Sequence, residues 1–406
     1  MTKAKTIVIS SVLAVSVAAM PGCATKQDET LNNYMTFFSM GTTAALVAQK
    51  GEEAAQMSVK EQNDLFDALC GDIYALMTSV ENSISSSLRT SYIWKFNEAE
   101  PGSEVELDET AYEILETAKS VYEFTQGYYN PAVWYSVDLY GFTTRPEGYE
   151  RAPYDRDKAT TEGGASYLPL PENKYVQAFK ELCAHFSEVE LSERDGKYYA
   201  YKPEATVEVD GAEYSLRLDL GGIGKGWTVN AVADMLDERG YTYGYFNFGT
   251  SSITVNSFSG SDGKYTISFT DPRGTGGYCS YKIKDENLST SGDYENYYMI
   301  DGTRYCHIID PTSGSPIQTG IASATVIGGS AAEDDALTTA LMAMGKEKAV
   351  GFINDNPEYF GGKIVTLLVI EGDKGTIITN DPDNITIRNQ NYTLGNTVSD
   401  GKIILN

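Results

Sequence analysis

Basic residues are scarce in this chain of 406 residues. It has 31 Lys and Arg residues against 57 Asp and Glu residues, so its formal net charge is -26 at pH 7. Nucleic acids are dense polyanions, and a chain this acidic with no basic patch is a poor candidate for binding them. Proline is also sparse, at 13 residues, and the sequence contains no internal repeat, which excludes collagen-like and coiled-coil proteins.

Aromatic residues are plentiful by comparison, and most of them are tyrosines. The 41% of hydrophobic residues and 22% of charged residues are typical of a globular protein, and the chain is long enough to bury a sizeable core. The 29 tyrosines offer flat apolar faces with a polar tip, which suit stacking on rings but are also common in extracellular β-rich proteins. Composition therefore indicates a globular protein without naming its function.

Long apolar runs are missing except at the N-terminus, and none reaches the roughly 18 residues expected of a membrane-spanning helix. Lys3 and Lys5 precede an apolar run that ends shortly before Cys23. This arrangement predicts an export signal over residues 1–22. The Gly-Cys pair at its end resembles the lipobox of bacterial lipoproteins, which predicts lipidation of Cys23 and a polar tether over residues 23–33. A plain secretory signal is the alternative. Either way, we expect an extracytoplasmic protein, and with Cys23 lipidated it is anchored to a bacterial membrane.

Cysteine is scarce, with four residues besides the one in the signal region: Cys70, Cys183, Cys279 and Cys306. Outside the cytoplasm they could form disulfides, but four cysteines allow three full pairings and the sequence does not choose among them. Their spacing does not match a zinc site.

Separate helical and strand patterns follow along residues 34–406, which we expect to form one domain. Hydrophobic periodicity and capping residues predict five helices, over Gln62–Ser85, from Asp108 to Gly127, Tyr175–Phe186, Trp227–Arg239 and Ala332–Met344. Strands are predicted over Tyr214–Leu220, Tyr243–Phe248, Ser252–Asn256, Tyr265–Phe269, Tyr278–Ile283 and Ile364–Ile370, before a β-rich tail. Residues 143–172, rich in Pro, Gly, Tyr and charge, are predicted to be an irregular insertion. The mixture indicates an α+β fold.

A glycine-rich loop lies between a predicted strand and a predicted helix. Residues 218–226 read LDLGGIGKG. Such a loop can bring backbone N–H groups and a helix N-terminus against a phosphate. It is not a Walker A motif, because Gly226 rather than Ser or Thr follows Lys225, and its glycine spacing does not match the dinucleotide motif. A merely tight turn is the alternative.

An acidic run begins the helix predicted near residue 332. Asp335 and Thr339 are four residues apart, so they share one face of the helix. A carboxylate and a hydroxyl are hard oxygen ligands suited to Mg²⁺. The alternative is that Glu333, Asp334 and Asp335 only complement the helix dipole.

Histidine is nearly absent, with two residues in the chain. His307 lies in the run 302–316, which follows the Ser/Thr-rich segment 288–293. A lone histidine is more often structural than catalytic, and the Asp-Pro-x-x-Gly-x-Pro pattern after His307 is typical of a turn. His185 lies in a predicted helix, where we interpret it as a packing residue.

Taken together, these segments resemble the ApbE family, whose members are FAD:protein FMN transferases. The matching segments occur in the family's order: Met40-Gly-Thr42, Phe96-Asn97, Gly127-Tyr-Tyr-Asn-Pro131 with Tyr140-Gly-Phe142, DLGGIGKG, STSGDY, HIIDPTSGSP and DDALTTAL. They extend from about Met40 to Ile370, and so many ordered segments with compatible spacing are hard to obtain by chance.

The resemblance implies a T-fold-like α+β architecture and a Mg²⁺-dependent reaction. FMN would be moved from FAD to a Thr or Ser of a partner flavoprotein, with release of AMP. The implied metal ligands are the carbonyl of Gly222, Asp335 and Thr339, which favours the metal-site interpretation of the acidic helix over the dipole one. The implied FAD contacts are Met40, Tyr128, Tyr129, Asn130, Asp219, Lys225, His307, Ile308 and Ile309.

The resemblance also assigns chemistry to particular side chains. Lys225 would neutralise the pyrophosphate, and the tyrosine pair could stack on a flavin or adenine ring. Asp219 and His307 are both candidates for the base that activates the attacking hydroxyl. Three positions depart from the family: Asn130 replaces the usual Asp, Gly224 replaces a common Ala, and Ser87 aligns where an aromatic residue often covers the flavin.

Three other functions remain open at this level. The same site could hydrolyse FAD to FMN and AMP, as a Mg²⁺-dependent pyrophosphatase. A non-catalytic FAD-binding lipoprotein would share the signal and most of the motifs; Asn130 and Ser87 leave it open, while Lys225 and the Asp335–Thr339 pair argue against it. A solute-binding lipoprotein would share the signal and the aromatic content but not the ordered motifs. The acceptor implied by the family is a membrane-bound flavoprotein, and no nucleic acid is expected.

Overall fold

The computed structural model describes residues 31, 33–143, 160–162, 165–167, 170–258, 262–372 and 374–406. The predicted signal peptide, Cys23 and most of the predicted tether lie outside the described residues, as does most of the predicted insertion over 143–172. Within that insertion, β4 (Thr160–Glu162) and β5 (Ala165–Tyr167) pair as an antiparallel hairpin, so it is not irregular throughout.

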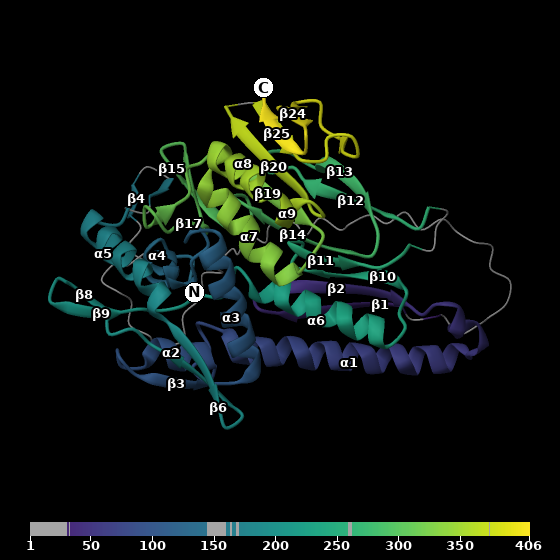
Figure 1. The fold of residues 1–406 in the computed structure, drawn as a ribbon, viewed down its shortest axis with the longest axis horizontal. Coiled ribbons are helices and arrows are strands. Elements are labelled where there is room, and N and C mark those ends of the chain that lie inside the picture. Colours follow the sequence, from purple (N-terminus) through teal and green to yellow (C-terminus); the bar gives the residue numbers. More distant parts are fainter. Residues whose placement is uncertain are drawn as a thin grey trace.

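A nine-stranded sheet forms the centre of the molecule (Figure 1). All neighbours in it are antiparallel except the last pair, which is parallel. Its strands, in spatial order, are β1 (Tyr34–Ser39), β2 (Thr42–Gln49), β10 (Tyr243–Phe248), β11 (Ser252–Val255), β14 (Glu286–Gly292), β19 (Ile321–Ile327), β20 (Ile364–Glu371), β21 (Lys374–Thr379) and β23 (Tyr392–Leu394).

Helices cover one face of this sheet in two layers. The inner layer is α6 (Gly224–Glu238) and α7 (Ala331–Met344), and α1 (Val59–Ile84) and α3 (Glu109–Phe124) pack behind them (Figure 1). The sheet alternates accordingly: Val365 and Leu367 of β20 join the helical core, whereas Leu368 faces the other side. This division of one strand between two cores is what an antiparallel strand buried on both faces requires.

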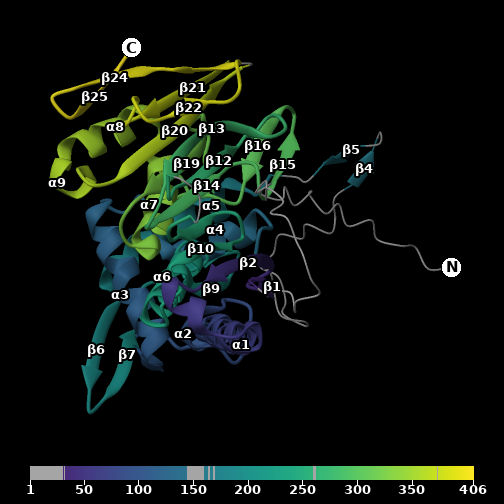
Figure 2. The same ribbon diagram turned by 90° about the vertical axis from the view of Figure 1, so that its right-hand side faces the viewer.

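The opposite face is covered by a small sheet made of β12 (Tyr265–Thr270), β13 (Gly277–Ile283) and β22 (Thr386–Ile387). Short two- and three-stranded sheets lie around the centre: β3 (Glu104–Leu107) with β7 (Lys197–Tyr201) and β6 (Glu190–Arg194), β8 (Thr206–Val209) with β9 (Ala212–Ser215), β15 (Tyr297–Ile300) with β16 (Thr303–Cys306), β17 (Ile309–Asp310) with β18 (Ser315–Pro316), and β24 (Asn396–Ser399) with β25 (Lys402–Leu405). The C-terminal pair lies at the end of the molecule opposite α1 (Figure 2).

The remaining helices are short and lie at the periphery. They are α2 (Tyr92–Glu98), α4 (Trp134–Leu139), α5 (Asn173–Ala184), α8 (Lys346–Asp355) and α9 (Pro357–Phe360), with single 3-10 turns over Glu52–Gln56, Pro131–Val133 and His185–Glu188. The predicted α+β class is therefore confirmed.

The longest predicted helix is confirmed and begins slightly earlier than expected. Ser58 accepts a hydrogen bond from the backbone N–H of Glu61, whose side chain accepts one from the backbone N–H of Ser58. This capping box starts α1 at Val59. Leu65 is 41% exposed and Phe66 is buried in its place, so the buried stripe is shifted by one residue at this end.

The strand predicted over Tyr214–Leu220 is wrong beyond Ser215, where β9 ends. The alternating leucines of this segment are buried, so the pattern itself is real. However, Leu218 finds its partner in a side chain: its N–H donates to Asn97 Oδ1 at 2.7 Å, and its carbonyl accepts from Asn97 Nδ2 at 2.9 Å. One amide side chain thus takes the place of a neighbouring strand.

The glycine-rich loop is shorter than predicted, because α6 begins at Gly224 rather than at Trp227. Glycine is a poor helix former, but Gly226 serves a packing purpose here. A Cβ added at Gly226 would lie 2.1 Å from the carbonyl oxygen of Ala331 and 2.8 Å from the Cβ of Asp335. Only glycine therefore permits this approach of α6 to α7.

The four cysteines of the domain are free and buried, so the disulfides considered from the sequence are not formed. Burial raises the pKa of the Cys70 thiol to about 11 and that of Cys183 to about 12. Within the described part of the chain, no helix combines the length and the apolar character needed to cross a bilayer.

We predict that Gly226→Ala destabilises the fold. The added methyl group would force α6 and α7 apart, and overpacking of this kind costs about 1–3 kcal/mol of unfolding free energy. Gly71 is the matched control, since it lies inside α1 with no atom within 4 Å of an added Cβ. Gly71→Ala should stabilise the protein by about 0.5–1 kcal/mol. Urea unfolding followed by circular dichroism measures both changes, and equal midpoints for the two variants would contradict the proposed contact.

Candidate functional site

A cavity of about 720 Å³ opens beside the first turns of α6 and α7. Ligand sites typically have volumes of about 300–1,000 Å³. Every residue that the sequence predicts for the metal or the flavin lines this cavity: Met40, Tyr128, Tyr129, Asn130, Asp219, Gly222, Lys225, His307, Ile308, Ile309, Asp335 and Thr339. Segments far apart in the chain are therefore brought to one place.

The glycine-rich loop forms one wall and is held by its own polar groups. Asp219 Oδ1 accepts a hydrogen bond from the N–H of Gly221 at 2.8 Å, and the N–H of Asp219 donates to the carbonyl of Pro131 at 2.7 Å. Lys225 Nζ donates to the carbonyl of Gly221 at 3.2 Å. Burial raises the pKa of Asp219 above its usual range, while the Gly221 N–H and Lys225 oppose that rise. The loop thus presents a carboxylate and an ammonium group side by side.

The adjacent wall is α7, which is joined to α6 by a buried hydrogen bond. Asp335 Oδ2 accepts from the N–H of Gly226 at 3.0 Å, and Asp335 is only 3% exposed. One turn later, Thr339 Oγ1 lies 3.2 Å from Ser291 Oγ of β14. A Cβ added at Gly222 would lie 3.5 Å from Thr339 Oγ1, so the two residues are close neighbours.

These groups suit a hard divalent cation. Asp335 supplies a carboxylate, Thr339 a hydroxyl and Gly222 a backbone carbonyl, which are oxygen donors of the kind that Mg²⁺ prefers. No ion pair among the described residues includes Asp335, so this buried carboxylate lacks a cationic partner. The buried hydroxyl of Tyr129 also has no hydrogen-bond partner, and burial, Asp335 and Asp219 all raise its pKa. The described residues contain no group of three His, Cys, Asp or Glu side chains that could hold a metal by themselves.

The cavity wall carries more negative than positive charge. Among its described lining residues, Lys225 is the one cationic side chain, against the carboxylates of Glu81, Asp219, Glu295 and Asp335. Burial raises the pKa of Glu295, Lys225 opposes this rise and Asp335 adds to it. A diphosphate ligand would be repelled by such a wall, and a divalent cation between the phosphates and the carboxylates removes that repulsion.

The tyrosine pair divides its roles between the surface and the interior. Tyr129 is buried and lies against the glycine loop, with a ring carbon 3.6 Å from the position of an added Cβ on Gly222. Tyr128 is half-buried, and its hydroxyl accepts a hydrogen bond from Lys348 Nζ at 2.6 Å. Stacking of either ring on a flavin or adenine remains a prediction.

The hydrogen bonds of Asn130 explain why an amide rather than a carboxylate occupies this position. Its Oδ1 accepts from the N–H of Ala132 at 2.9 Å, and its Nδ2 donates to the carbonyl of Cys183 at 2.8 Å. An ionised Asp could make the first bond, but it would place a carboxylate oxygen against the Cys183 carbonyl. The Asn130 side chain therefore links the backbone at Ala132 to that at Cys183 and so stabilises this part of the cavity wall.

His307 is held by a backbone carbonyl. The imidazole Nδ1 lies 3.3 Å from the carbonyl oxygen of Asn296. A carbonyl only accepts, so Nδ1 carries the proton and Nε2 keeps its lone pair. Burial and the charge of Lys225 lower the pKa of His307 to about 4, with the Asn296 carbonyl opposing them. The ring is therefore neutral near pH 7, with Nε2 unprotonated.

The other histidine does not belong to the site. His185 was predicted to pack within a helix, and this is wrong. It ends α5 near the surface, where Nδ1 lies 2.7 Å from Glu188 Oε1. The two isoleucines that follow His307 are buried and give the cavity an apolar wall.

Met40 enters the cavity from a strained turn. It has a φ of 49°, and the Gly41 that follows has a φ of 72°, so the β1–β2 hairpin closes with two left-handed residues. This turn normally favours Asn or Gly at its first position, and a methionine there costs conformational energy. The strain is consistent with a side chain kept for the cavity rather than for the turn.

Several lining residues were missed by the sequence reasoning. They come from the end of α1 and the residues just after it, from β14, and from the loop after β14: Glu81, Ser85, Ser86, Thr290, Ser291, Glu295 and Asn296. Glu295 and Asn296 directly follow the quoted STSGDY segment, so their position was the available signal. Ser87, which aligns at the usual aromatic position, does line the cavity.

Comparison with known proteins gives a consistent result. The ApbE family matches residues 40–360 of this chain. A relative from Treponema pallidum, named FAD:protein FMN transferase, is 25% identical over 295 residues, covering 70% of this chain and 74% of the relative. A protein of the same name from Vibrio cholerae is 35% identical over 162 residues, covering 39% of this chain and 46% of the relative.

Solved structures show the same fold. The flavin transferase ApbE from Vibrio cholerae superposes with a TM-score of 0.65 at 23% identity, over 85% of this chain and 96% of that one. The apo form of the flavinyl transferase ApbE from Pseudomonas stutzeri gives a TM-score of 0.64 at 22% identity, over 85% and 93%. The architecture implied by the sequence resemblance is therefore confirmed.

We predict that His307 titrates near pH 4 and that Lys225→Met moves its pKa up toward the ordinary value of 6.5. Removing the ammonium group removes the repulsion that disfavours the imidazolium, while burial still holds the pKa low. Proton NMR of the imidazole, in a His185→Gln background that leaves one histidine, measures the midpoint. Lys282→Met, which removes an exposed lysine paired with Asp262, should leave it unchanged. A wild-type midpoint near 6.5 would refute the assignment.

Proposed function

Because this chain belongs to the ApbE family, we propose that it is an FAD:protein FMN transferase that uses Mg²⁺. The observation that carries the proposal is the convergence of Gly222, Asp335 and Thr339 beside Lys225 in a single cavity of ligand size. The curated relatives carry this activity in their names. Magnesium is proposed from the oxygen donors and from the excess of carboxylates on the wall.

The proposed reaction breaks the phosphoanhydride bond of FAD and forms a phosphoester. The hydroxyl oxygen of an acceptor Thr or Ser attacks the phosphorus of the FMN half of FAD. A new P–O bond forms, the P–O bond to the AMP half breaks, and its electron pair leaves on the AMP oxygen. The hydroxyl proton passes to a base. The products are the FMN-modified acceptor and AMP, so atoms and charge balance without any redox step.

Lys225 and the first turn of α6 are proposed to bind the pyrophosphate. An ammonium group and a helix N-terminus both favour phosphate oxygens. Asp335, Thr339 and the Gly222 carbonyl would hold the metal ion. When bound, Mg²⁺ would stabilise negative charge on the phosphate oxygens and on the departing AMP.

His307 is the better candidate for the base. Its Nε2 has a lone pair near neutral pH, since Nδ1 is committed to the Asn296 carbonyl. Asp219 has one carboxylate oxygen occupied by the Gly221 N–H and lies beside Lys225, so we propose that it holds the loop and the substrate. The ring of Phe142 packs edge-on against the imidazole, with 6.5 Å between the two ring centroids, and limits its movement.

Hydrolysis of FAD is the competing reaction at the same site. The small side chains of Ser85, Ser86 and Ser87 line the cavity, and Ser87 aligns where other members often have an aromatic residue. This leaves room for water to replace the acceptor hydroxyl. A non-catalytic FAD-binding lipoprotein is disfavoured, since Lys225, Asp335 and Thr339 are all retained together in the cavity.

We further propose that the protein acts outside the cytoplasm and is anchored through a lipid on Cys23. The basic residues, apolar run and Gly-Cys pair at the N-terminus support this proposal. The proposed acceptor is a flavoprotein of the same membrane, which the anchor would bring within reach.

Asp335→Asn is expected to lower FMN transfer by roughly 100-fold or more, because charge-stabilising groups of this kind contribute about 10²–10³ in kcat. The amide keeps the shape of the side chain but cannot balance the charge of a cation. The assay incubates FAD and Mg²⁺ with a domain that carries a candidate acceptor Thr, and follows AMP by chromatography and acceptor mass. Asp108→Asn makes the same change at the N-cap of α3, away from the cavity, and should have wild-type activity.

The wild-type products distinguish the candidate functions. AMP together with an acceptor heavier by one FMN supports the transferase. AMP with free FMN, whichever acceptor is offered, favours the hydrolase. Tight FAD binding without AMP would eliminate both enzymes and leave the binding protein.

Cys23→Ser is expected to release the protein from the membrane, because stable attachment through acyl chains requires the lipidated residue. Fractionation of bacteria that express the full chain, with metabolic labelling by palmitate, measures both attachment and lipidation. Ala24→Ser is the control and should stay labelled and membrane-bound. Continued labelling of the Cys23→Ser protein would show that the lipid is elsewhere.

A further inference from the structure

We propose that Arg273, from the turn between β12 and β13, is a positioning residue for the transfer reaction. It does not line the cavity. Its guanidinium holds Asp293, and the loop that begins at Asp293 supplies Glu295 to the cavity wall and the Asn296 carbonyl to His307. The expected change in kcat rests on the proposed function, but the effect of Arg273 on the position of His307 can be measured separately.

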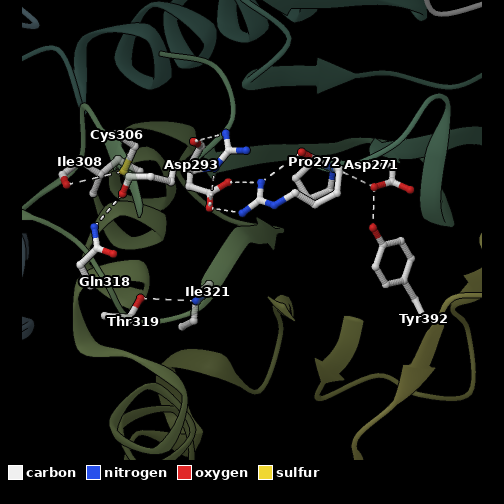
Figure 3. A network of polar contacts seen from close by, with 11 residues as sticks. Asp271, Pro272, Asp293, Cys306, Ile308, Gln318, Thr319, Ile321 and Tyr392 are labelled. Atoms are coloured by element: carbon white, nitrogen blue, oxygen red, sulfur yellow. Dashed lines mark hydrogen bonds and ion pairs between the residues drawn. The ribbon is translucent and has the colours of Figure 1, made fainter. Parts of the chain in front are cut away.

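The contact between Arg273 and Asp293 is bidentate (Figure 3). Nη1 donates to Oδ1 at 2.7 Å and Nη2 to Oδ2 at 2.5 Å. The side chains are 31% and 14% exposed, so the pair is partly shielded from water. A two-point contact fixes orientation as well as distance, which a single ion pair does not.

Arg273 is itself held by a buried carboxylate. Asp271 is 4% exposed and accepts the N–H of Arg273 at 2.9 Å. The same carboxylate accepts the hydroxyl of Tyr392 at 2.5 Å (Figure 3). It also accepts the Nδ2 of Asn389 at 2.6 Å. Both of these donors lie beyond residue 360, where the family match ends. The C-terminal part of the chain therefore fixes the turn from which Arg273 reaches Asp293.

Asp293 is held from a second side as well. Its N–H donates to the carbonyl of Ala322 in β19 at 3.0 Å, and its own carbonyl accepts from Arg304 Nη1 at 3.4 Å. Arg304 also lies over the ring of Tyr297, 3.6 Å from its centroid. These contacts fix the loop at its first residue and just beyond its last.

The loop transmits this position to the candidate base. The Asn296 carbonyl accepts hydrogen bonds from both the backbone N–H of His307, at 3.0 Å, and its Nδ1, at 3.3 Å. Asn296 is three residues from Asp293, so the chain between them spans at most roughly 10–11 Å and links the two positions closely. Loss of the Arg273 contact should therefore loosen the carbonyl that sets the tautomer of His307.

The test compares Arg273→Met with Arg273→Lys and with Arg194→Met. Arg194 makes a bidentate contact of the same kind with Glu104, at 3.0 and 2.7 Å, but in the small β3–β7–β6 sheet away from the cavity. We expect Arg273→Met to lower kcat for FMN transfer roughly 10- to 100-fold, as small misplacements of catalytic groups do, with a much smaller change in the dissociation constant for FAD. Arg273→Lys keeps the charge and should restore part of kcat, and Arg194→Met should keep wild-type kcat.

A second readout follows His307 directly, in the His185→Gln background. Imidazole ¹⁵N shifts should report the Nδ1–H tautomer in the otherwise unchanged chain and a mixture of tautomers in Arg273→Met. Unchanged kcat and unchanged ¹⁵N shifts in Arg273→Met would overturn the inference, as would an equal loss of kcat in Arg194→Met. If the wild-type protein transfers no FMN, the proposed function fails, and the ¹⁵N comparison alone then decides whether Arg273 positions His307.

Discussion

The close approach of α6 to α7 is the constraint on which the rest of the site depends. At its closest point, the N–H of Gly226 donates to the carboxylate of Asp335, where no side chain larger than hydrogen fits. Asn230 of α6 also bonds the N-terminal end of α7, through Ser330 and the N–H of Ala331. This approach brings the Gly222 backbone beside Thr339 and sets Lys225 on the same wall. A glycine that weakens the helix locally is thus required by the tertiary structure, and the helix is stabilised by packing against the sheet rather than by its own propensity.

The same contact buries the Asp335 carboxylate, and a bound cation would compensate its charge. Asp335 is buried without a cationic partner among the described residues, and Tyr129 adds a buried hydroxyl without an acceptor. Uncompensated buried charge lowers the stability of the folded state, and a cation that binds only the folded state restores it. The stability of the domain should therefore be linked to the divalent cation proposed for this site and, through that cation, to a diphosphate ligand. His307 does not add a second uncompensated buried charge, because its imidazole is neutral near pH 7.

Local patterns in the sequence predicted the long helices and the strands β10, β11 and β20, but not β1, β2, β14 and β19 of the central sheet. The α1 helix follows from periodicity and capping, whereas α7 is buried on nearly all sides and has no single apolar face. The pattern of Leu216, Leu218 and Leu220 is equally regular, but Asn97, more than a hundred residues earlier, takes the backbone groups that a strand would have used. Likewise, all twelve residues implied by the resemblance line the cavity, whereas Glu295 was missed although it directly follows the STSGDY segment.

The site contains groups that are expected to touch the substrate and other groups that hold them in position. The two sets differ in how easily they can be recognised in the sequence. Groups expected to touch the substrate lie on short segments that keep their spacing, so they can be found in order along the chain. The groups that orient them act through backbone carbonyls and carboxylates, as Asn296 does for His307 and Asp271 does for Arg273. Every residue has a backbone carbonyl, so the residue type does not reveal this role. The donors to Asp271 come from the C-terminal strand region, outside the family match. Orientation of the reactive groups is therefore a property of the whole domain, including the part that the motifs do not cover.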